Sequence, residues 1–237
     1  MFDKCIEAHK VHAHYGLSHI LRGVDLKISK GETVALMGRN GMGKTTLIKC
    51  IMKLALCSSG SIKIFGDDIS SLDVFNIARK GVAYVPEGRG IFPNLTVREN
   101  LLMAHRAGRS GRNEWTFNRV LENFPRLEQR LGHGGQQLSG GEQQMLSIGR
   151  ALLTNPDILI LDEATEGLAP LIAQDVWRII KLVQKTGIAS IIIDKNFKSL
   201  SAFVDRVAVM VNGRMVFDGS PRELGGRPND RRNWLGV

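Results

Sequence analysis

Eight consecutive residues have the types and spacing of a phosphate-binding loop. They match G-x-x-x-x-G-K-[ST] without a mismatch and are Gly38, Arg39, Asn40, Gly41, Met42, Gly43, Lys44 and Thr45. Glycines let a backbone wrap phosphates so that its N–H groups face them, while the lysine and the threonine hydroxyl can reach the terminal phosphates and Mg²⁺. An apolar run, Thr33–Met37, precedes the loop, and a helical pattern follows it. We therefore predict an ATP and Mg²⁺ site that includes Thr46.

A second motif places a serine and two glycines at the start of a helical pattern. It consists of Leu138, Ser139, Gly140, Gly141, Glu142 and Gln143. A hydroxyl and unhindered N–H groups at a helix N-terminus favour an anion, although an ordinary capped helix is the commoner explanation for Ser-Gly-Gly alone. The six residues resemble the signature of the ABC ATPases, which contacts ATP held by the opposite subunit. This resemblance implies that a second chain completes the site.

A third motif is an aliphatic run, residues 158–161, that ends in the carboxylates Asp162 and Glu163. The run predicts a central parallel strand, and ligands bind at the carboxyl ends of such strands. Asp162 resembles the Walker B aspartate that holds Mg²⁺, and Glu163 is placed to polarise the attacking water as the general base. A solvated acidic turn would explain the pair alone, but the other two motifs favour a catalytic site.

The short separations between the three motifs resemble those of transporter-type ABC cassettes, and no heptad region interrupts them. The resemblance implies an α/β fold with a RecA-like P-loop NTPase core, an antiparallel β-subdomain and an inserted α-helical subdomain. We expect a single ABC ATPase domain over residues 1–237. The core and β-subdomain would occupy 1–84 and 156–237, and the linker and helical signature subdomain would occupy 85–155.

Periodicity predicts the elements that must position these motifs. Strand patterns occur near 5–11, 22–28, 61–65, 189–193 and 206–211. Helical patterns occur near 97–106, 114–123 and 141–153. The first three strands are expected in the β-subdomain, the last two in the core, and the three helices in the inserted subdomain.

Composition argues against several other classes of protein. No stretch of about 18 apolar residues is present, and the first residues lack the apolar core of a signal peptide. Three scattered cysteines, Cys5, Cys50 and Cys57, lack metal-ligand spacing and are expected to be reduced thiols. The net charge of +9 comes with interspersed acids and few aromatics. This pattern favours a face near a membrane partner and lipid head groups over a nucleic-acid platform.

The segment 85–101 is the most informative for subfamily. It reads VPEGRGIFPNLTVRENL, and most ABC cassettes carry glutamine where Glu87 stands. This segment, GGQQLSGGEQQMLSIGRAL and EGLAP resemble the LivF-like ATPases of branched-chain amino acid importers. The resemblance implies that the linker senses the γ-phosphate and Mg²⁺ and adjoins a groove for a cytoplasmic helix of the membrane subunit. Glu87 could coordinate Mg²⁺, because a carboxylate is a hard ligand.

Three further positions bear on the ATP site. Tyr15 resembles the aromatic residue that stacks on adenine, although packing at a hairpin edge would also explain it. Ala169 stands where the D-loop commonly has aspartate. Lys195 stands at the position of the usual switch histidine, and all six histidines lie at or before His133. Its ammonium could contact the γ-phosphate, or it could simply point into solvent.

The resemblance also implies partners and a location. We expect a second ABC ATPase subunit, resembling LivG, two integral membrane permeases and, indirectly, a periplasmic substrate-binding protein. The chain would lie at the cytoplasmic face of the inner membrane and bind no nucleic acid. The alternatives are an importer cassette for urea, short amides or aromatic acids, an ATPase for lipid or lipopolysaccharide export, and a non-transport ATPase of DNA repair or translation.

Overall fold

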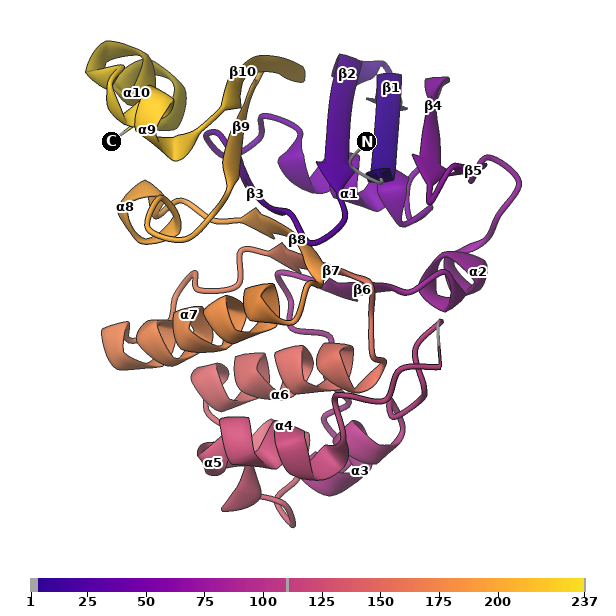
Figure 1. Cartoon of the computed structure of the whole chain (residues 1–237), viewed down its shortest axis with the longest axis vertical. Coiled ribbons are helices and arrows are strands. Elements are labelled where there is room, and N and C mark those ends of the chain that lie inside the picture. The colour runs from indigo at the N-terminus through magenta and orange to yellow at the C-terminus, as the bar shows by residue number, and fades with distance from the viewer. Residues whose placement is uncertain (1–3, 110, 237) are drawn as a thin grey trace.

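Six strands form the larger of two sheets, in the order β10-β9-β3-β8-β7-β6 (Figure 1). A computed structural model describes residues 4–109 and 111–236. Every residue of β3, β7 and β8 is buried, as expected for parallel strands that are covered on both faces. The strands are β3 (Thr33–Met37), β6 (Val82–Val85), β7 (Ile158–Asp162), β8 (Ala189–Ile193), β9 (Arg206–Val211) and the antiparallel β10 (Arg214–Gly219).

The smaller sheet is antiparallel and has the order β2-β1-β4-β5. It consists of β1 (Lys4–Tyr15), β2 (Ser18–Ser29), β4 (Ser59–Ile64) and β5 (Asp67–Asp68). One hydrophobic cluster joins this sheet to helix α1 (Lys44–Ile51) and to the larger sheet, through Leu21, Ile48 and Val34 among others. The helix that follows the phosphate-binding loop is therefore held by both sheets.

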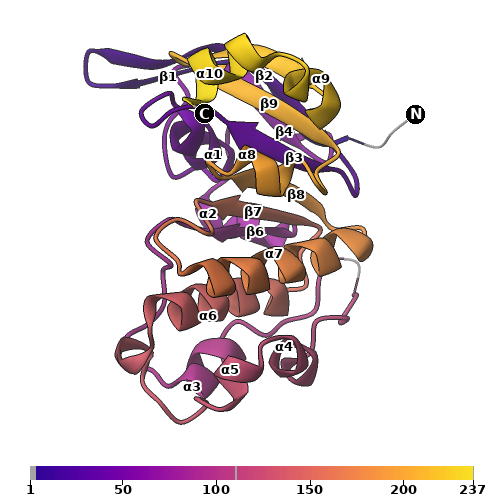
Figure 2. The same cartoon turned by 90° about the vertical axis from the view of Figure 1, so that its left-hand side faces the viewer.

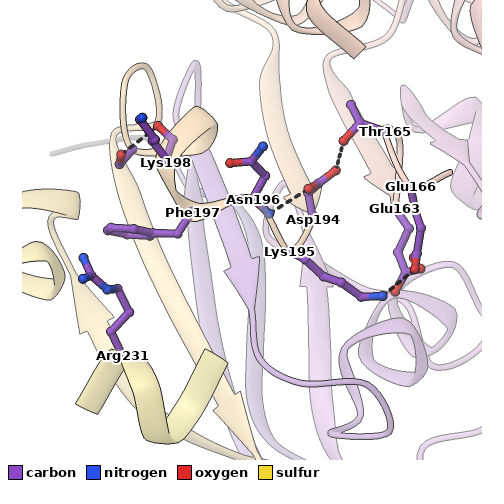
Figure 3. Close-up of a pocket in the computed structure, with 10 residues that line it drawn as sticks. Glu163, Thr165, Glu166, Asp194, Lys195, Asn196, Phe197, Lys198 and Arg231 are labelled. Atoms are coloured by element: carbon purple, nitrogen blue, oxygen red, sulfur yellow. Dashed lines mark hydrogen bonds and ion pairs between the residues drawn. The ribbon is translucent and has the colours of Figure 1, made fainter. Parts of the chain in front are cut away.

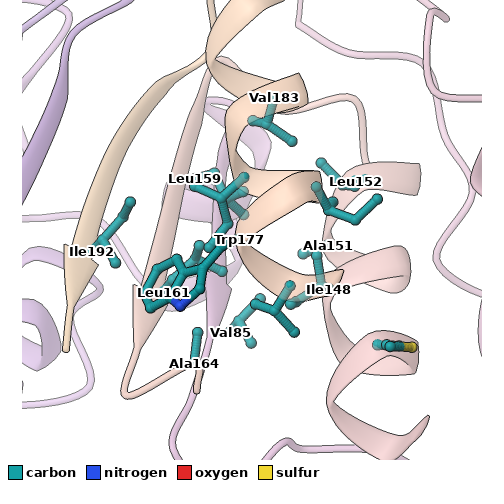
Figure 4. Packing of buried hydrophobic residues seen from close by; sticks show 14 of the residues in the cluster. Val85, Ile148, Ala151, Leu152, Leu159, Leu161, Ala164, Trp177, Val183 and Ile192 are labelled. Atoms are coloured by element: carbon teal, nitrogen blue, oxygen red, sulfur yellow. The ribbon is translucent and has the colours of Figure 1, made fainter. Parts of the chain in front are cut away.

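Helices cover the other face of the larger sheet and extend away from it (Figure 2). The long helices α6 (Gly140–Leu153) and α7 (Pro170–Lys185) lie next to the sheet. Figure 4 shows their packing, in which Ile148 and Trp177 meet Leu159 and Leu161 of β7. Beyond α6 lie α3 (Val97–Leu102), α4 (Phe117–Asn123), α5 (Pro125–Glu128) and a 3₁₀ turn (Gly135–Gln137).

The remaining helices are short and lie at the edges of the molecule. They are α2 (Val74–Arg79), α8 (Phe197–Leu200), α9 (Pro221–Gly225) and α10 (Pro228–Leu235). The last of these approaches the phosphate-binding loop, because the Arg39 guanidinium donates a hydrogen bond to the carbonyl of Arg232 at 3.1 Å. Over residues 4–109 and 111–236, no helix is both long and apolar enough to span a bilayer.

The predicted strands and helices are present, with shifted ends. The helix expected near 97–106 ends at Leu102, and the one expected near 114–123 begins at Phe117 because the Thr116 hydroxyl caps it. The strand expected near 5–11 extends to Tyr15. Periodicity did not identify β6 and α7: β6 has only 4 residues, and α7 follows a loop with no side-chain cap.

Candidate active site

The phosphate-binding loop connects β3 to α1 and packs closely against its neighbours. Gly38 has φ 140°, and a Cβ there would lie 2.2 Å from the carbonyl oxygen of Met210, so only glycine fits. The carbonyl of Met42 accepts a hydrogen bond from the Gly213 N–H at 3.0 Å, and Asn40 and Gly41 are exposed. The loop is thus fixed at its base and open at its tip.

Lys44 is the first residue of α1, and its side chain folds back over the loop. Its ammonium donates hydrogen bonds to the carbonyls of Gly38 at 2.8 Å and Arg39 at 2.9 Å. Burial lowers the pKa of Lys44, although the carboxylates of Glu163 and Asp162 act in the opposite sense. The ammonium therefore lies between the loop and the acidic strand ends.

Asp162, the last residue of β7, is fully buried and has two hydrogen-bond donors. The Thr45 hydroxyl donates to Oδ1 at 3.2 Å, and the Tyr84 hydroxyl donates to Oδ2 at 3.1 Å. Burial raises the pKa of this carboxyl group. Tyr84 was not predicted from the sequence, because β6 is short and its position next to β7 depends on contacts between distant parts of the chain.

The oxygens of Thr45 and Asp162 are the hard ligands that Mg²⁺ takes, so these residues fit the ion. Over residues 4–109 and 111–236 no group of three or more His, Cys, Asp or Glu side chains could hold a metal by itself. Mg²⁺ is usually bound by one or two protein ligands together with phosphates and water.

Glu163 lies just beyond Asp162 in a left-handed backbone conformation, with φ 54°. Its N–H donates a hydrogen bond to the carbonyl of Ile193 at 2.9 Å, which ties it to the end of β8. A hydrogen bond with Glu166, together with burial, raises the pKa of Glu163 to about 7. The neighbouring carboxylate of Glu166 therefore favours the protonated form of Glu163.

Lys195 forms an ion pair with Glu166, the carboxylate next to Glu163 (Figure 3). The hydrogen bond that the Lys195 ammonium donates to Glu166 raises the pKa of Lys195. These residues line one cavity of about 820 Å³, which also includes Thr165 and Asp194. The Thr165 hydroxyl and the Asn196 N–H both donate to the Asp194 carboxylate, which fixes the turn that carries Lys195.

Glu87 is exposed in the linker after β6. Its negative charge adds to the effect of burial in raising the pKa values of Asp162 and Glu163. Glu87 therefore acts on these carboxylates through its charge, and no hydrogen bond joins it to them in the described part of the chain.

The residues of the signature motif begin α6. Ser139 caps the helix, and its backbone N–H donates to the Glu142 carboxylate at 2.8 Å, which completes a capping box. Arg89 of the linker also contacts the motif, because its guanidinium donates to the Gln143 amide oxygen at 2.8 Å. The Ser147 hydroxyl donates to the Arg89 carbonyl. Arg89 was not among the site residues predicted from the sequence.

Both glycines of the signature motif are closely packed. A Cβ on Gly141 would lie 2.5 Å from Cγ2 of Ile172 in α7, and one on Gly140 would lie 2.8 Å from the Arg89 guanidinium. Leu138 is buried among the helices, whereas Ser139 is exposed. The serine thus faces outward while its neighbours anchor the motif.

Tyr15 lies at the end of β1, beside the turn to β2, and its side chain is 51% exposed. The same hairpin touches the phosphate-binding loop, since a Cβ on Gly43 would lie 3.0 Å from Cδ2 of Leu21. Thr46 is half-buried in the first turn of α1. The hairpin that ends β1 therefore packs against the phosphate-binding loop through the buried Leu21.

Comparison with known proteins places the chain in a family. The model of the ABC transporter family matches residues 21–166. The chain is 39% identical to the branched-chain amino acid transport ATP-binding protein BraG of Pseudomonas aeruginosa, over 96% of this chain and 97% of BraG. It is 35% identical to a probable LivF of Archaeoglobus fulgidus, over 91% and 92%. It is 33% identical to the lipopolysaccharide export protein LptB of Escherichia coli, over 92% and 91%.

Solved structures agree with this assignment. An ATP-binding subunit of an ABC transporter superposes with a TM-score of 0.81 at 29% identity, covering 94% of this chain and 95% of that one. A dimeric ATP-binding cassette bound to ADP and phosphate gives 0.80 at 25% identity, covering 92% and 99%. Members of the family bind ATP or ADP, hydrolyse ATP, and work with membrane permeases in transporter complexes. This chain belongs to the ABC transporter family of ATP-binding proteins and is an ATPase.

Proposed function

We propose that the chain is the ATP-hydrolysing subunit of an importer for branched-chain amino acids. The observation that carries this proposal is the similarity to BraG, which extends over 96% of the chain. The similarity to LivF supports the same substrate class. In this proposal, ATP-driven dimerisation of two cassettes powers the movement of the amino acid through membrane subunits.

The loop from Gly38 to Thr46 would hold the phosphates of ATP, and Tyr15 would stack on adenine. The ammonium of Lys44 would exchange its two carbonyl partners in the loop for phosphate oxygens. Thr45 and Asp162 would hold Mg²⁺, and Glu87 would add a carboxylate ligand. The ion, when bound, neutralises charge on the phosphates.

Glu163 would act as the general base toward the attacking water. A pKa near 7 suits that task, since a base works best when its pKa is near the working pH. Lys195 holds Glu166 through an ion pair, and we propose that it turns to the γ-phosphate when ATP binds.

The signature motif would act on a different ATP molecule. Arg89, Ile172 and Gly135 contact the motif, whereas the phosphate-binding loop contacts Met210 and Gly213. The exposed Ser139 is therefore available to a second chain. We propose that Ser139 and Gly141 cover the ATP of a partner cassette resembling LivG, whose own signature motif covers the ATP held here.

A groove beside the linker is the proposed docking site for a permease. It has a volume of about 550 Å³ and is lined by Lys49, Leu54, Tyr84, Pro86 and Arg150, among others. Phe75 is 63% exposed and Met103 55% exposed on the elements around it. We propose that a cytoplasmic helix of each of two permeases inserts into such a groove. The subunit would then lie peripherally on the cytoplasmic face of the inner membrane, with a periplasmic binding protein delivering the amino acid.

Export of lipopolysaccharide is the second candidate, because LptB is 33% identical over most of the chain. Importers of urea, short amides or aromatic acids share the same motifs and are further candidates. Each of them would use the same ATP chemistry, so they differ in the permeases that the groove accepts.

Uptake of labelled leucine, urea and an aromatic acid by wild-type and deletion cells tests the proposal. We expect the deletion to abolish leucine uptake alone. The wild-type gene should restore uptake, and Glu163→Gln should fail to do so at equal expression. Normal leucine uptake with accumulation of lipopolysaccharide at the inner membrane would instead favour the exporter.

A further inference from the structure

A basic groove lies along the exposed face of α7, where α8 and the end of α4 meet that helix. Its volume of about 650 Å³ is in the range of small-molecule sites. Three basic residues and no acidic one belong to its described lining. The basic residues are Arg178, Lys181 and Lys185, and the neutral polar ones are Asn123, Gln174 and Ser199. The groove is therefore complementary in charge to an anion.

The three cations lie on one face of α7 because they are three and four residues apart. Like charges at these spacings repel each other and destabilise a helix. Asp175 is the only acidic residue of α7, and it pairs with Arg126 at 4.0 Å. In the described part of the chain, none of the cations Arg178, Lys181 and Lys185 forms an ion pair with a carboxylate. A solvated helix face usually alternates acids and bases, so this face differs from one that only meets water.

Contacts with neighbouring elements position two of the cations. The Arg178 guanidinium donates a hydrogen bond to the carbonyl of Asn123, at the end of α4, at 2.9 Å. The Lys181 ammonium lies 5.5 Å from the centre of the Phe203 ring, and that ring packs against Trp177 with centroids 5.7 Å apart. Side chains that are already positioned lose less conformational entropy when a ligand binds.

We propose that this groove binds a phosphorylated small molecule that carries at least two negative charges. A guanidinium presents its N–H donors in one plane and can bind a phosphate through two of them, while lysine ammonium groups add positive charge. The bond to Asn123 uses one of the five N–H groups of Arg178. Lys181 and Lys185 are separated by about 6 Å along the helix axis, so two phosphates of a diphosphate can each meet one of them. The ligand would bridge α7 with α4 and α8.

The groove is separate from the ATP site. None of the described residues that line it also lines the cavity beside Glu163 or the space beside Gly38. Binding in the groove does not depend on the proposed transport function. Its test must distinguish an anion in the groove from an anion on the phosphate-binding loop.

The tryptophans provide a local readout for this distinction. The chain has three tryptophans, so the ¹⁵N-labelled protein gives three indole N–H signals, and Trp177→Phe assigns the signal from the groove. In a titration with inorganic pyrophosphate at low ionic strength, we expect a saturable shift of the Trp177 signal. Trp234 belongs to α10, the helix that Arg39 of the phosphate-binding loop contacts. A shift confined to Trp234, or no saturable shift of Trp177 at millimolar pyrophosphate, would overturn the proposal.

Two double variants test whether the cations of the groove bind the anion. Lys181→Gln with Lys185→Gln removes two positive charges from exposed side chains, and we expect the Kd for pyrophosphate at the groove to rise at least about tenfold. Lys27→Gln with Lys63→Gln removes the same charge from the exposed face of the smaller sheet and should leave the Kd unchanged. Equal weakening in both double variants would show that net charge alone attracts the anion, and it would overturn the proposal.

An anionic lipid head group has the same phosphate chemistry and is distinguished with vesicles. Wild type and the Lys181→Gln, Lys185→Gln variant should sediment equally with phosphatidylglycerol vesicles, because we assign the groove to a soluble ligand. Loss of vesicle binding in this variant, with an unchanged Kd for pyrophosphate, would overturn that assignment.

Discussion

The strand-end site and the signature motif differ in how completely this chain builds them. Asp162 is fully buried, and Thr45, Tyr84 and the neighbouring strands fix it from within. Ser139 is exposed at the tip of α6, and its motif is held from behind by Arg89. A buried carboxylate is stable only if hydrogen-bond donors within the fold contact it, because burial removes its contact with water. An exposed helix N-terminus stays hydrated and can bind an anion when one is present. The first site is therefore preformed, whereas the serine of the second is open to solvent.

Removal of the carboxylate of Glu163 should give the largest effect at the strand-end site. Glu163→Gln keeps the shape of the side chain but cannot accept the proton of water, so we expect ATP turnover to fall about 10²- to 10⁴-fold. ATP binding should persist, because the residues of the loop are unchanged. The ATPase rate of the assembled complex measures turnover, and titration with a fluorescent nucleotide measures binding. Wild-type turnover would exclude Glu163 as the base.

Loss of Arg89 should disturb the position of the signature motif and leave the site around Asp162 unchanged. Arg89→Ala removes a hydrogen bond from a charged donor to Gln143, which is worth about 1.5–3 kcal/mol. We expect turnover of the complex to fall at least about tenfold, with unchanged nucleotide affinity of the isolated chain. Arg98→Ala, in which an exposed arginine of α3 is removed, is the matched control. Equal losses in both variants would show that Arg89 does not position the motif.

Lys195 could act by contacting the γ-phosphate or by balancing the negative charge of Glu166, and two variants distinguish these roles. If the ammonium contacts the γ-phosphate, Lys195→Ala should lower turnover on the order of tenfold, as expected for a hydrogen bond from a charged donor. Adding Glu166→Gln should not restore it. If Lys195 only balances the charge of Glu166, the double variant should recover activity. An unchanged ATPase rate in Lys195→Ala would show that Lys195 does not contact the γ-phosphate.

The smallest effect is expected at Tyr84. Tyr84→Phe removes one neutral donor to Asp162 at constant ring volume, a change of about 0.5–1.5 kcal/mol. We expect the Mg²⁺ concentration that supports half-maximal turnover to change by about 2- to 10-fold, with little change in thermal stability. A large fall in the melting temperature with unchanged Mg²⁺ dependence would mean that the hydroxyl serves packing alone.

The predicted fold agrees with the structure where the sequence pattern is local. The strand before Gly38, the strand before Asp162 and the helix after Ser139 all follow from short runs of apolar residues and from capping. The strand β6 escaped prediction because it is only 4 residues long and lies between Gly81 and Pro86. Its position next to β7 depends on contacts with distant parts of the chain.

The sequence by itself determined the motifs, the family and the chemistry available to them, because those depend on residue types at fixed spacing. Only the tertiary structure decided which side chains support the motifs. Tyr84 reaches Asp162 across neighbouring strands, Arg89 reaches Gln143 from the linker, and Lys195 pairs with Glu166. These contacts join residues far apart in the chain, and their positions follow from sheet order and helix packing, which no local pattern encodes.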